Sequence, residues 1–329
     1  MMKSFASKRN KALTVFMFCS IVQLLTARNI QSDNVIFALS GQEASVIGMV
    51  DSSSTEMIIP KYVEYADNVF DVTSINDRAF ISHNNLKKVS LPETIRRIGS
   101  LAFAFCDSLS QINITNTIDT ICTDAFYNCF SLPVEDNIRY AGCFLVSISD
   151  INAQELVIRD GCKWIGDNAI SNCHELKKII IPGSVKVIGN FAFSACDKLE
   201  TIDIPDSVEL IYHSTFSACS NLKKIYLPEK TKSYFFEKTK SYFFDLFIDC
   251  YNLNCIYINS IYPPIIIDDN NSHHPPMNCF YRFNADSCRL IVPYGSKKHY
   301  KKAPGWNSFK RIVCKKHNKM TQRYTCDLQ

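Results

Sequence analysis

The residues best suited to chemistry in this 329-residue chain are its fifteen cysteines. A thiolate can attack a carbon centre, bind a transition metal or pair into a disulfide, so such a chain invites all three interpretations. Six cysteines share one spacing, and most neighbours among them are 23 residues apart: Cys106, Cys129, Cys173, Cys196, Cys219 and Cys250. Cysteine is small and among the most buried residue types, so this regular set favours unreacted thiols packed in a core.

The remaining chemistry lies near the C-terminus. A disulfide among four cysteines would join the segments of a C-terminal cap if the compartment is oxidising: Cys279, Cys288, Cys314 and Cys326. His273 and His274 lie close by, but their spacing matches no zinc-ligand pattern, and the two prolines that follow mark an exposed loop. No nucleophile-elbow or glycine-rich phosphate loop occurs. We therefore expect no metal, no cofactor and no catalytic residue, and a cysteine- or metal-dependent enzyme is the weakest alternative.

The cysteine spacing belongs to a longer repeat. Leucine follows the cysteine position by three residues in seven copies, with His83 replacing the first cysteine: Leu86, Leu109, Leu132, Leu176, Leu199, Leu222 and Leu253. A second apolar column precedes the same position by three residues: Phe80, Phe103, Phe126, Ile170, Phe193, Phe216 and Phe247. A fixed period in this range is typical of a solenoid, in which each repeat buries its apolar edge against its neighbours.

Each repeat predicts the same elements in the same order. In the copy around Cys196, the alternation at the end of Leu199–Ile204 predicts a short strand. After Pro205 a second extended run follows, with Val208 and Ile211 facing inward. The inward residues of 192–196 are three and four apart, which predicts a single helical turn. We therefore expect an α+β solenoid, a right-handed stack with one parallel strand ladder and about 23 residues per repeat.

Two gaps depart from the period. Cys129 and Cys173 are 44 residues apart, which predicts a degenerate rung over 130–165, with a hairpin-like pair of strands at 140–148 and 156–158. Cys219 and Cys250 are 31 residues apart, and between them one octapeptide occurs twice, at 229–236 and 237–244. Removing one copy restores the period of the other repeats. We expect this duplication to form a loop that exposes Tyr234, Phe235 and Phe236.

The two ends differ from the repeats. Residues 1–27 combine four basic residues with an apolar run, which predicts a secretory signal peptide, and nothing after it is long and apolar enough to span a bilayer. Residues 28–74 are expected to cap the repeats of 75–260, and 261–329 to form a C-terminal cap with a basic tail. There we predict a last strand at 290–293, a short helix at 297–302 and a closing cluster of Trp306, Phe309, Ile312 and Val313.

Charge is distributed unevenly along the chain. Residues 28–294 contain 22 basic and 31 acidic side chains, whereas 295–329 contain ten basic and one acidic. The basic end would suit an anionic surface or the acidic body of the same chain. No basic groove interleaved with aromatic residues is apparent, so nucleic acid is not an expected partner.

Residues 181–202 carry the repeat almost whole, as Ile-Pro-x-Ser-Val-x-x-Ile-Gly-x-x-Ala-Phe-x-x-Cys-x-x-Leu-x-x-Ile. This pattern resembles the BspA-like leucine-rich repeat family, and 292–309 is similar to the closing segment of such proteins in Bacteroidetes. The resemblance spans about 75–313. It implies a leucine-rich-repeat fold and an exported or surface protein, because members of the family are mostly exported or surface proteins. Some of them are adhesins for host matrix proteins or other microbes, and many have no known role. This chain departs from the family in having no cell-wall sorting sequence, no clear lipobox and no appended catalytic domain.

The outward side of the strand ladder is the candidate binding surface. On neighbouring rungs the pattern brings together aromatic, aliphatic and basic side chains: Lys177, Lys178, Ile180, Lys223, Lys224, Tyr226 and Tyr257. The sequence thus predicts a secreted or cell-surface protein that binds a protein or another surface macromolecule without chemistry. One alternative is a structural surface-assembly component with no discrete ligand, in which the lysines only protect a solvated sheet from aggregation.

Overall fold

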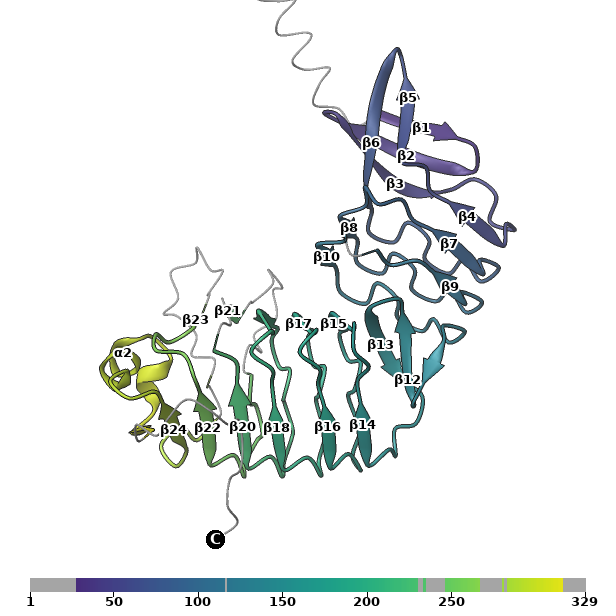
Figure 1. Ribbon diagram of the computed structural model, residues 1–329. Coiled ribbons are helices and arrows are strands. Elements are labelled where there is room, and N and C mark those ends of the chain that lie inside the picture. Colours follow the sequence, from purple (N-terminus) through teal and green to yellow (C-terminus); the bar gives the residue numbers. More distant parts are fainter. Residues whose placement is uncertain are drawn as a thin grey trace, which may run out of the picture. The chain divides into compact units, whose positions relative to one another are not determined.

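The computed structural model describes residues 28–115, 117–229, 233–234, 246–266, 280 and 283–315 (Figure 1). The chain divides into two compact units. The first unit holds the chain up to Val134 together with Arg139–Val146, and the second holds Glu135–Ile138 and the chain from Ser147 onward. The cap and repeat boundaries expected from the sequence remain predictions.

The first unit contains two sheets. One begins with three antiparallel strands, β1 (Arg28–Ser32), β2 (Val35–Ser40) and β3 (Glu43–Met49). It continues in parallel through β6 (Asn68–Ile75), β8 (Arg97–Ile98) and β10 (Thr120–Ile121). The strand β5 (Tyr62–Tyr65) forms a hairpin with β6. The other holds β4 (Glu56–Ile58), β7 (Lys88–Ser90) and β9 (Gln111–Ile112), all parallel. Lys88 pairs with Gln111, so these two partners are one repeat period apart.

Three short strands follow in the chain: β11 (Val134–Glu135), β12 (Ile138–Ala141) and β13 (Phe144–Ile148). Gly142 lies between the last two with φ 55, a left-handed conformation that glycine adopts without steric cost.

The second unit contains two ladders of parallel strands. We call the first of these the strand side. It begins with the pair β14 (Glu155–Val157) and β16 (Lys178–Ile180) (Figure 1). It continues as the sheet of β18 (Thr201–Asp203), β20 (Lys224–Leu227), β22 (Cys255–Ile258), β24 (Arg289–Val292) and β25 (Arg311–Cys314). The other ladder holds β15 (Trp164–Ile165), β17 (Val187–Ile188), β19 (Leu210–Ile211), β21 (Ser233–Tyr234) and β23 (Ile265–Ile266). Thr201 pairs with Lys224, again one period further along the chain.

The repeated apolar columns form the core, as predicted. All seven leucines are buried, and so are the seven members of the Phe column. Neighbouring rings of that column stack with centroids 5.1 Å apart for Phe80 and Phe103 and 5.7 Å apart for Phe193 and Phe216. Because the same residue type returns at each rung, identical side chains pack on one another and the apolar area stays out of water.

The helical turn predicted around each cysteine is wrong. This segment, which we call the turn side, is a run of tight turns whose alternate N–H groups donate to the next rung. Phe193 N donates to Thr215 O at 2.9 Å, and Ala195 N donates to Ser217 O at 2.8 Å. Phe191 (φ 53) and Ala195 (φ 57) are left-handed, which a helix excludes. The turn side is therefore hydrogen-bonded between rungs, as the strands are.

The predicted pairing of 140–148 with 156–158 is also wrong. Glu155–Val157 forms β14, which lies parallel to β16 with Glu155 opposite Lys178. This separation of one repeat period places β14 in the ladder as a regular strand. The rung that looks degenerate in sequence therefore contains a normal strand. The sequence pattern does not mark this strand, because the Cys and Leu of the repeat are absent from their usual places before it.

The duplicated octapeptide is only partly described. Ser233–Tyr234 forms β21, in register with Leu210 and Ile211, so at least these two residues of the first copy form a strand and not a loop. Leu210 pairs with Ser233, which is one repeat period further along the chain, so the first copy of the octapeptide keeps the spacing of the other repeats. The side chain of Tyr234, and all of Phe235, Phe236 and the second copy, lie outside the described residues.

The C-terminal elements close the second unit. The predicted short helix is present as α2 (Lys297–Lys302), followed by a 3-10 helix at Trp306–Ser308. Trp306, Phe309 and Ile312 are buried as predicted, but Val313 is 46% exposed because it alternates outward on β25. The strand predicted at 290–293 is β24, and it is not the last one. Among the described residues, no helix has the length and apolar character that crossing a bilayer requires.

Candidate functional site

The buried thiols of the turn side serve the fold. Cys106, Cys219 and Cys250 each donate a hydrogen bond from Sγ to the carbonyl of the Phe one rung earlier, at 3.0 Å. The cysteines of the described part of the chain are thiols outside any disulfide. Cys279 and Cys326 lie outside the described residues, so the disulfide expected in the C-terminal cap stays a prediction for them.

These thiols are poor candidates for chemistry. Burial raises the pKa of Cys106 to about 12 and that of Cys288 to about 12, and it also raises the pKa of Cys250. A nucleophile or metal ligand must be a thiolate, whereas these sulfurs hold their protons at neutral pH. No group of three His, Cys, Asp or Glu residues within the described ranges could hold a metal ion. His273 and His274 are not described.

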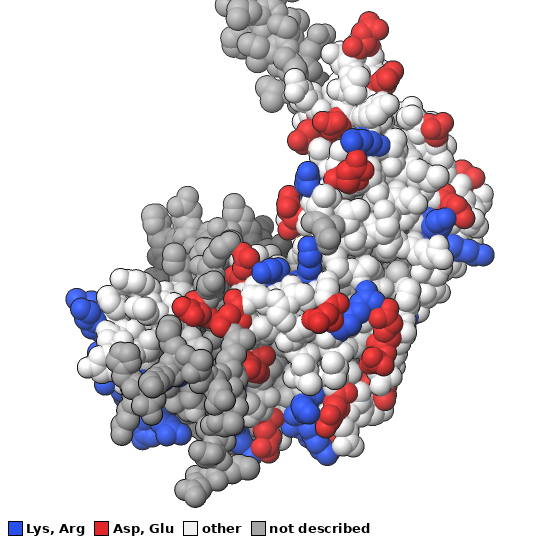
Figure 2. All heavy atoms as spheres, in the orientation of Figure 1, with Lys and Arg blue, Asp and Glu red and all other residues white. Residues whose placement is uncertain are grey.

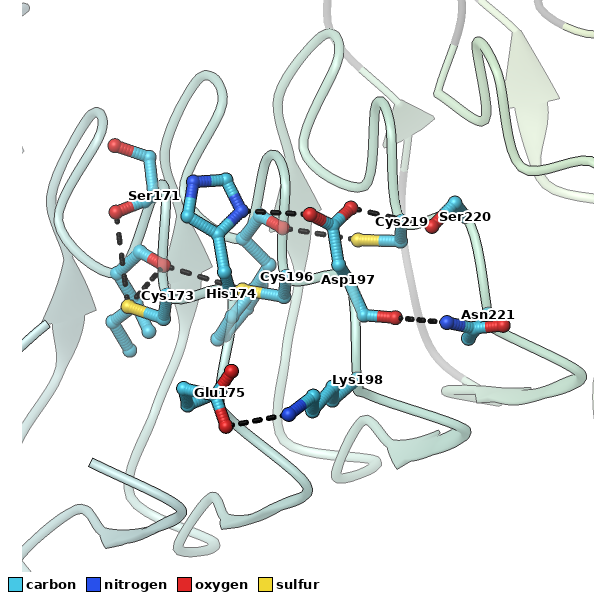
Figure 3. A network of polar contacts seen from close by, with 12 residues as sticks. Ser171, Cys173, His174, Glu175, Cys196, Asp197, Lys198, Cys219, Ser220 and Asn221 are labelled. Atoms are coloured by element: carbon cyan, nitrogen blue, oxygen red, sulfur yellow. Dashed lines mark hydrogen bonds and ion pairs between the residues drawn. The ribbon is translucent and has the colours of Figure 1, made fainter. Parts of the chain in front are cut away.

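A polar network on the turn side contains the residue types of a hydrolytic triad (Figure 3). His174 Nδ1 lies 2.7 Å from Asp197 Oδ2, and Ser220 Oγ donates to Asp197 Oδ1 at 3.2 Å. The carboxylate thus stands between the histidine and the hydroxyl, whereas a nucleophilic serine must bond directly to the base. Since the three residues occupy the same position of three successive repeats, the network fastens neighbouring rungs together.

The strand side presents two rows of outward positions in the second unit. Strand pairing aligns Val157 with Ile180, and it aligns Asp203, Tyr226, Tyr257, Ile291 and Val313 with one another. Ile180 and Asp203 are one repeat period apart, and we call the whole set the apolar row. Two residues earlier on each strand lies the charged row, formed by Glu155, Lys178, Thr201, Lys224, Cys255, Arg289 and Arg311. Of these side chains only Cys255 is buried. Side chains two apart on a strand point to the same face, so the two rows lie side by side.

Two tyrosines form the centre of the apolar row. The rings of Tyr226 and Tyr257 stack with centroids 4.4 Å apart and planes 19° apart. Lys315 Nζ lies 6.0 Å from the centroid of the Tyr257 ring, and burial lowers the pKa of this lysine. Stacked rings held on adjacent strands lose little freedom when a partner binds.

Residues 61–135 and 146–263 match the BspA type leucine rich repeat region, in six copies. This match covers more than half of the chain. The chain belongs to the BspA-type leucine-rich repeat family. Among curated proteins, none matches this BspA-type chain.

Solved structures of leucine-rich repeat proteins resemble this BspA-type chain at low identity. A leucine-rich repeat protein from Bacteroides ovatus is 23% identical, over 87% of this chain and 76% of that one, with a TM-score of 0.39. A leucine rich cell surface protein from Faecalibacterium prausnitzii is 17% identical, over 88% and 95%, with a TM-score of 0.37. The pneumococcal vaccine antigen PcpA is 14% identical, over 88% and 99%, with a TM-score of 0.37.

The lysines predicted for the binding surface of this BspA-type chain differ in their surroundings. Lys177 Nζ donates to Gln154 at 2.9 Å, and Lys223 Nζ forms an ion pair with Glu200 at 2.7 Å. Lys178 lies 3.8 Å from Glu155. Lys224 makes no ion pair with another described residue and lies on the same strand as Tyr226. The structure thus brings Lys224, Tyr226 and Tyr257 together, whereas Ile180, 47% exposed, lies two strands away.

Sequence reasoning did not place the last two strands on this surface. Arg289 and Ile291 on β24 continue the two rows beyond Tyr257, and Arg311 and Val313 on β25 continue them further. Neither strand follows a Cys-x-x-Leu motif, so the repeat pattern does not mark them. The alternation of Leu290 and Val292, both buried, with more exposed neighbours was the available signal.

The strand side of the first unit is different. Its outward positions hold Ile58 and Ser90 on paired strands, followed by Asn113. The Asn113 amide accepts a hydrogen bond from Leu91 N at 2.7 Å and donates one to Leu91 O at 2.9 Å, so it is engaged within the ladder. A hollow of about 350 Å³ lies beside β9 and is lined by Lys88, Asn113 and Tyr140 among others. This unit has no stacked aromatic pair on its described strands β4, β7 and β9.

Proposed function

We propose that this BspA-type protein is exported and binds another protein at a cell surface through the strand side of its second unit, without catalysing a reaction. The single observation that carries the proposal is the stacked pair Tyr226 and Tyr257, partly exposed on the ladder between Asp203 and Ile291, with Lys224 on the same strand as Tyr226. Aromatic residues on a preorganised surface supply a large share of binding energy at protein interfaces.

Other features of the chain agree with a binding role. The core positions of the repeat are uniform, whereas the outward positions of the apolar row differ from rung to rung. A surface that varies on a constant scaffold is what specific recognition requires. Export is supported by the signal-like residues 1–27, which lie outside the described residues, and by the family resemblance. Secretion or cell-surface display and adhesion are therefore part of the proposal.

A capture experiment with the full chain tests this function. Wild-type protein and the variant Tyr226→Ala/Tyr257→Ala would be immobilised and exposed to host matrix proteins and to bacterial surface extracts. We expect the variant to lose a protein that wild type retains. The matched control is Tyr251→Ala/Tyr294→Ala, because these tyrosines are strongly exposed but lie outside the strands. Equal capture by all three forms would remove the site.

The duplicated octapeptide is a second place to test. Deleting 237–244 restores the repeat spacing that β19 and β21 already show. If the aromatic residues of the duplication take part in binding, the deletion reduces capture while the tyrosine pair is intact. Unchanged capture assigns binding to the strand side alone.

A further inference from the structure

We propose that the C-terminal part of the strand side, from β20 to β25, binds an acidic segment of the partner protein. This inference rests on the proposed function, because it names the chemistry of the partner at the same surface. It adds Arg289, Arg311, Ile291 and Val313 to the site.

The first observation concerns the charged row alone. In its first strands, Lys178 lies 3.8 Å from Glu155 of the same row. Outside the row, Lys223 pairs with Glu200 at 2.7 Å, and Lys310 pairs with Asp286. From β20 onward the charged row contains no carboxylate. Lys224, Arg289 and Arg311 form no ion pair with any residue that the structure describes.

The charge pattern is visible on the surface of the second unit. Figure 2 shows Lys and Arg beside Asp and Glu over the strands β14 to β18. On the visible surface of α2, Lys and Arg have no acidic neighbours. Positive charge on α2 is therefore close in sequence to Arg289 and Arg311, which are both exposed at the end of the charged row.

The second observation is a like-charge pair. Arg289 and Arg311 lie directly opposite each other on the parallel strands β24 and β25, and both are exposed. Strands lie about 4.8 Å apart, so the two guanidinium groups start from neighbouring backbones. Like charges in this position lower the stability of a sheet. A bound carboxylate would remove that repulsion, since guanidinium groups bind carboxylates with two parallel hydrogen bonds.

The third observation is the apolar row beside these cations. Tyr226, Tyr257, Ile291 and Val313 form its C-terminal half, about 7 Å from the charged row along each strand. A sulfated glycan would satisfy the cations but would leave these apolar side chains without a partner. A protein segment with acidic and apolar side chains satisfies both rows.

The other end of the face sets a boundary for such a segment. Asp203 occupies the apolar row on β18, and Glu155 occupies the charged row on β14. Their charges repel an acidic partner, so the attractive part of the face begins at β20. The site thus spans the strands β20, β22, β24 and β25.

The test uses the full chain and a random copolymer of glutamate and tyrosine as the probe. We expect wild type to bind immobilised copolymer and Arg289→Glu/Arg311→Glu to lose about tenfold or more in affinity, because two charge-assisted contacts become repulsive. The matched control is Lys297→Glu/Lys298→Glu on α2, which changes the net charge equally and should lose less than about twofold. Binding by wild type should weaken as salt rises.

Folding is checked with a third variant. Arg311→Glu alone places opposite charges on β24 and β25, so its unfolding midpoint should equal or exceed that of wild type while its affinity for the copolymer falls. A drop in affinity with an unchanged or raised midpoint supports the site.

Four results would overturn the inference. One is an equal loss of affinity for the copolymer in Arg289→Glu/Arg311→Glu and in Lys297→Glu/Lys298→Glu, which indicates general charge attraction. Another is tighter binding of heparin than of the copolymer with the same dependence on Arg311, which indicates a glycan. The third is self-association abolished by Arg311→Glu, which makes a second copy the occupant. If the captured partner needs Tyr226 and Tyr257 but binds Arg289→Glu/Arg311→Glu normally, the acidic segment is wrong and the proposed function stands.

Discussion

The turn side and the strand side of the same repeats follow opposite rules. On the turn side Phe193 and Phe216 stack as identical buried rings, and Cys219 bonds to the carbonyl of the rung before. On the strand side the outward residues of neighbouring rungs differ, as Asp203 is followed by Tyr226. The comparison teaches that positions which repeat hold the stack together, while positions which vary are available for recognition.

The physical cause is the number of neighbours. A turn-side ring such as Phe216 is stacked on the rings of the rungs before and after it, so a different shape at one rung disturbs two others. An outward side chain on the strand side contacts only its row neighbours and water, so it can change at little cost. Stability and binding can therefore be altered separately in this protein.

The largest expected effect is on the turn side. Phe193→Ala removes a fully buried ring that stacks on Phe216, and should lower the free energy of unfolding by about 3–5 kcal/mol. Val157→Ala, at 52% exposure on the strand side, should cost about 0.5 kcal/mol or less. Denaturant unfolding of both variants measures the difference, and similar losses would break the comparison.

The turn-side thiols should make stability depend on alkaline pH. The pKa of Cys106 is raised to about 12 in the folded state from an ordinary value of 9.0, so between these pH values the folded form holds a proton that the unfolded form has lost. The free energy of unfolding should then fall by about 1.4 kcal/mol per pH unit for each such thiol. Cys106→Ala should show a shallower fall than wild type, and an identical slope would contradict the assignment.

A close approach at Gly189, directly after β17, gives a smaller effect. A Cβ at Gly189 would lie 2.7 Å from the backbone nitrogen of Asp167, so Gly189→Ala should cost about 1–3 kcal/mol. Gly183→Ala is the control, because no atom lies within 4 Å of the Cβ position there. Thermal unfolding of Gly189→Ala and Gly183→Ala measures both changes. A lower midpoint in Gly189→Ala alone shows that the cost comes from steric crowding and not from replacing a glycine as such.

The smallest effect concerns ion pairs between rungs. Lys198→Ala breaks a 2.6 Å pair with Glu175 on the turn side, and Lys223→Ala breaks a 2.7 Å pair with Glu200 on the strand side. All four side chains are well exposed, so each change should cost less than about 1 kcal/mol. Denaturant unfolding measures both costs. A loss above about 1 kcal/mol for only one of the two variants would show that ion pairs also contribute differently on the turn side and the strand side.

The sequence predicts the core of this fold better than its edges. The spacing of Leu199 and Phe193 predicts both buried columns, because burial of a repeated side chain depends only on period. The turn geometry could not be predicted, since Phe191 and Ala195 adopt a left-handed conformation that neither residue favours. Their own N–H groups bond to the next rung, Phe191 N to His213 O at 3.2 Å and Ala195 N to Ser217 O at 2.8 Å, and these bonds hold them there.

The candidate site shows the same division. Tyr226 and Tyr257 could be placed side by side from the period, and their stacking follows from it. Arg289 and Arg311 could not, because β24 and β25 join the ladder through hydrogen bonds that no repeated motif marks. The loop residues Phe235 and Phe236 lie outside the described residues, so their exposure stays a prediction.

The hydrogen bonds from Cys106, Cys219 and Cys250 to main-chain oxygens require sulfur in its reduced form. Each such thiol contributes to the fold without further modification. Folding around it needs neither an oxidant to form disulfides nor an isomerase to correct mispaired ones. This part of the protein can therefore mature equally well in anoxic and in aerated surroundings, and a reducing agent in the medium should leave its melting temperature unchanged.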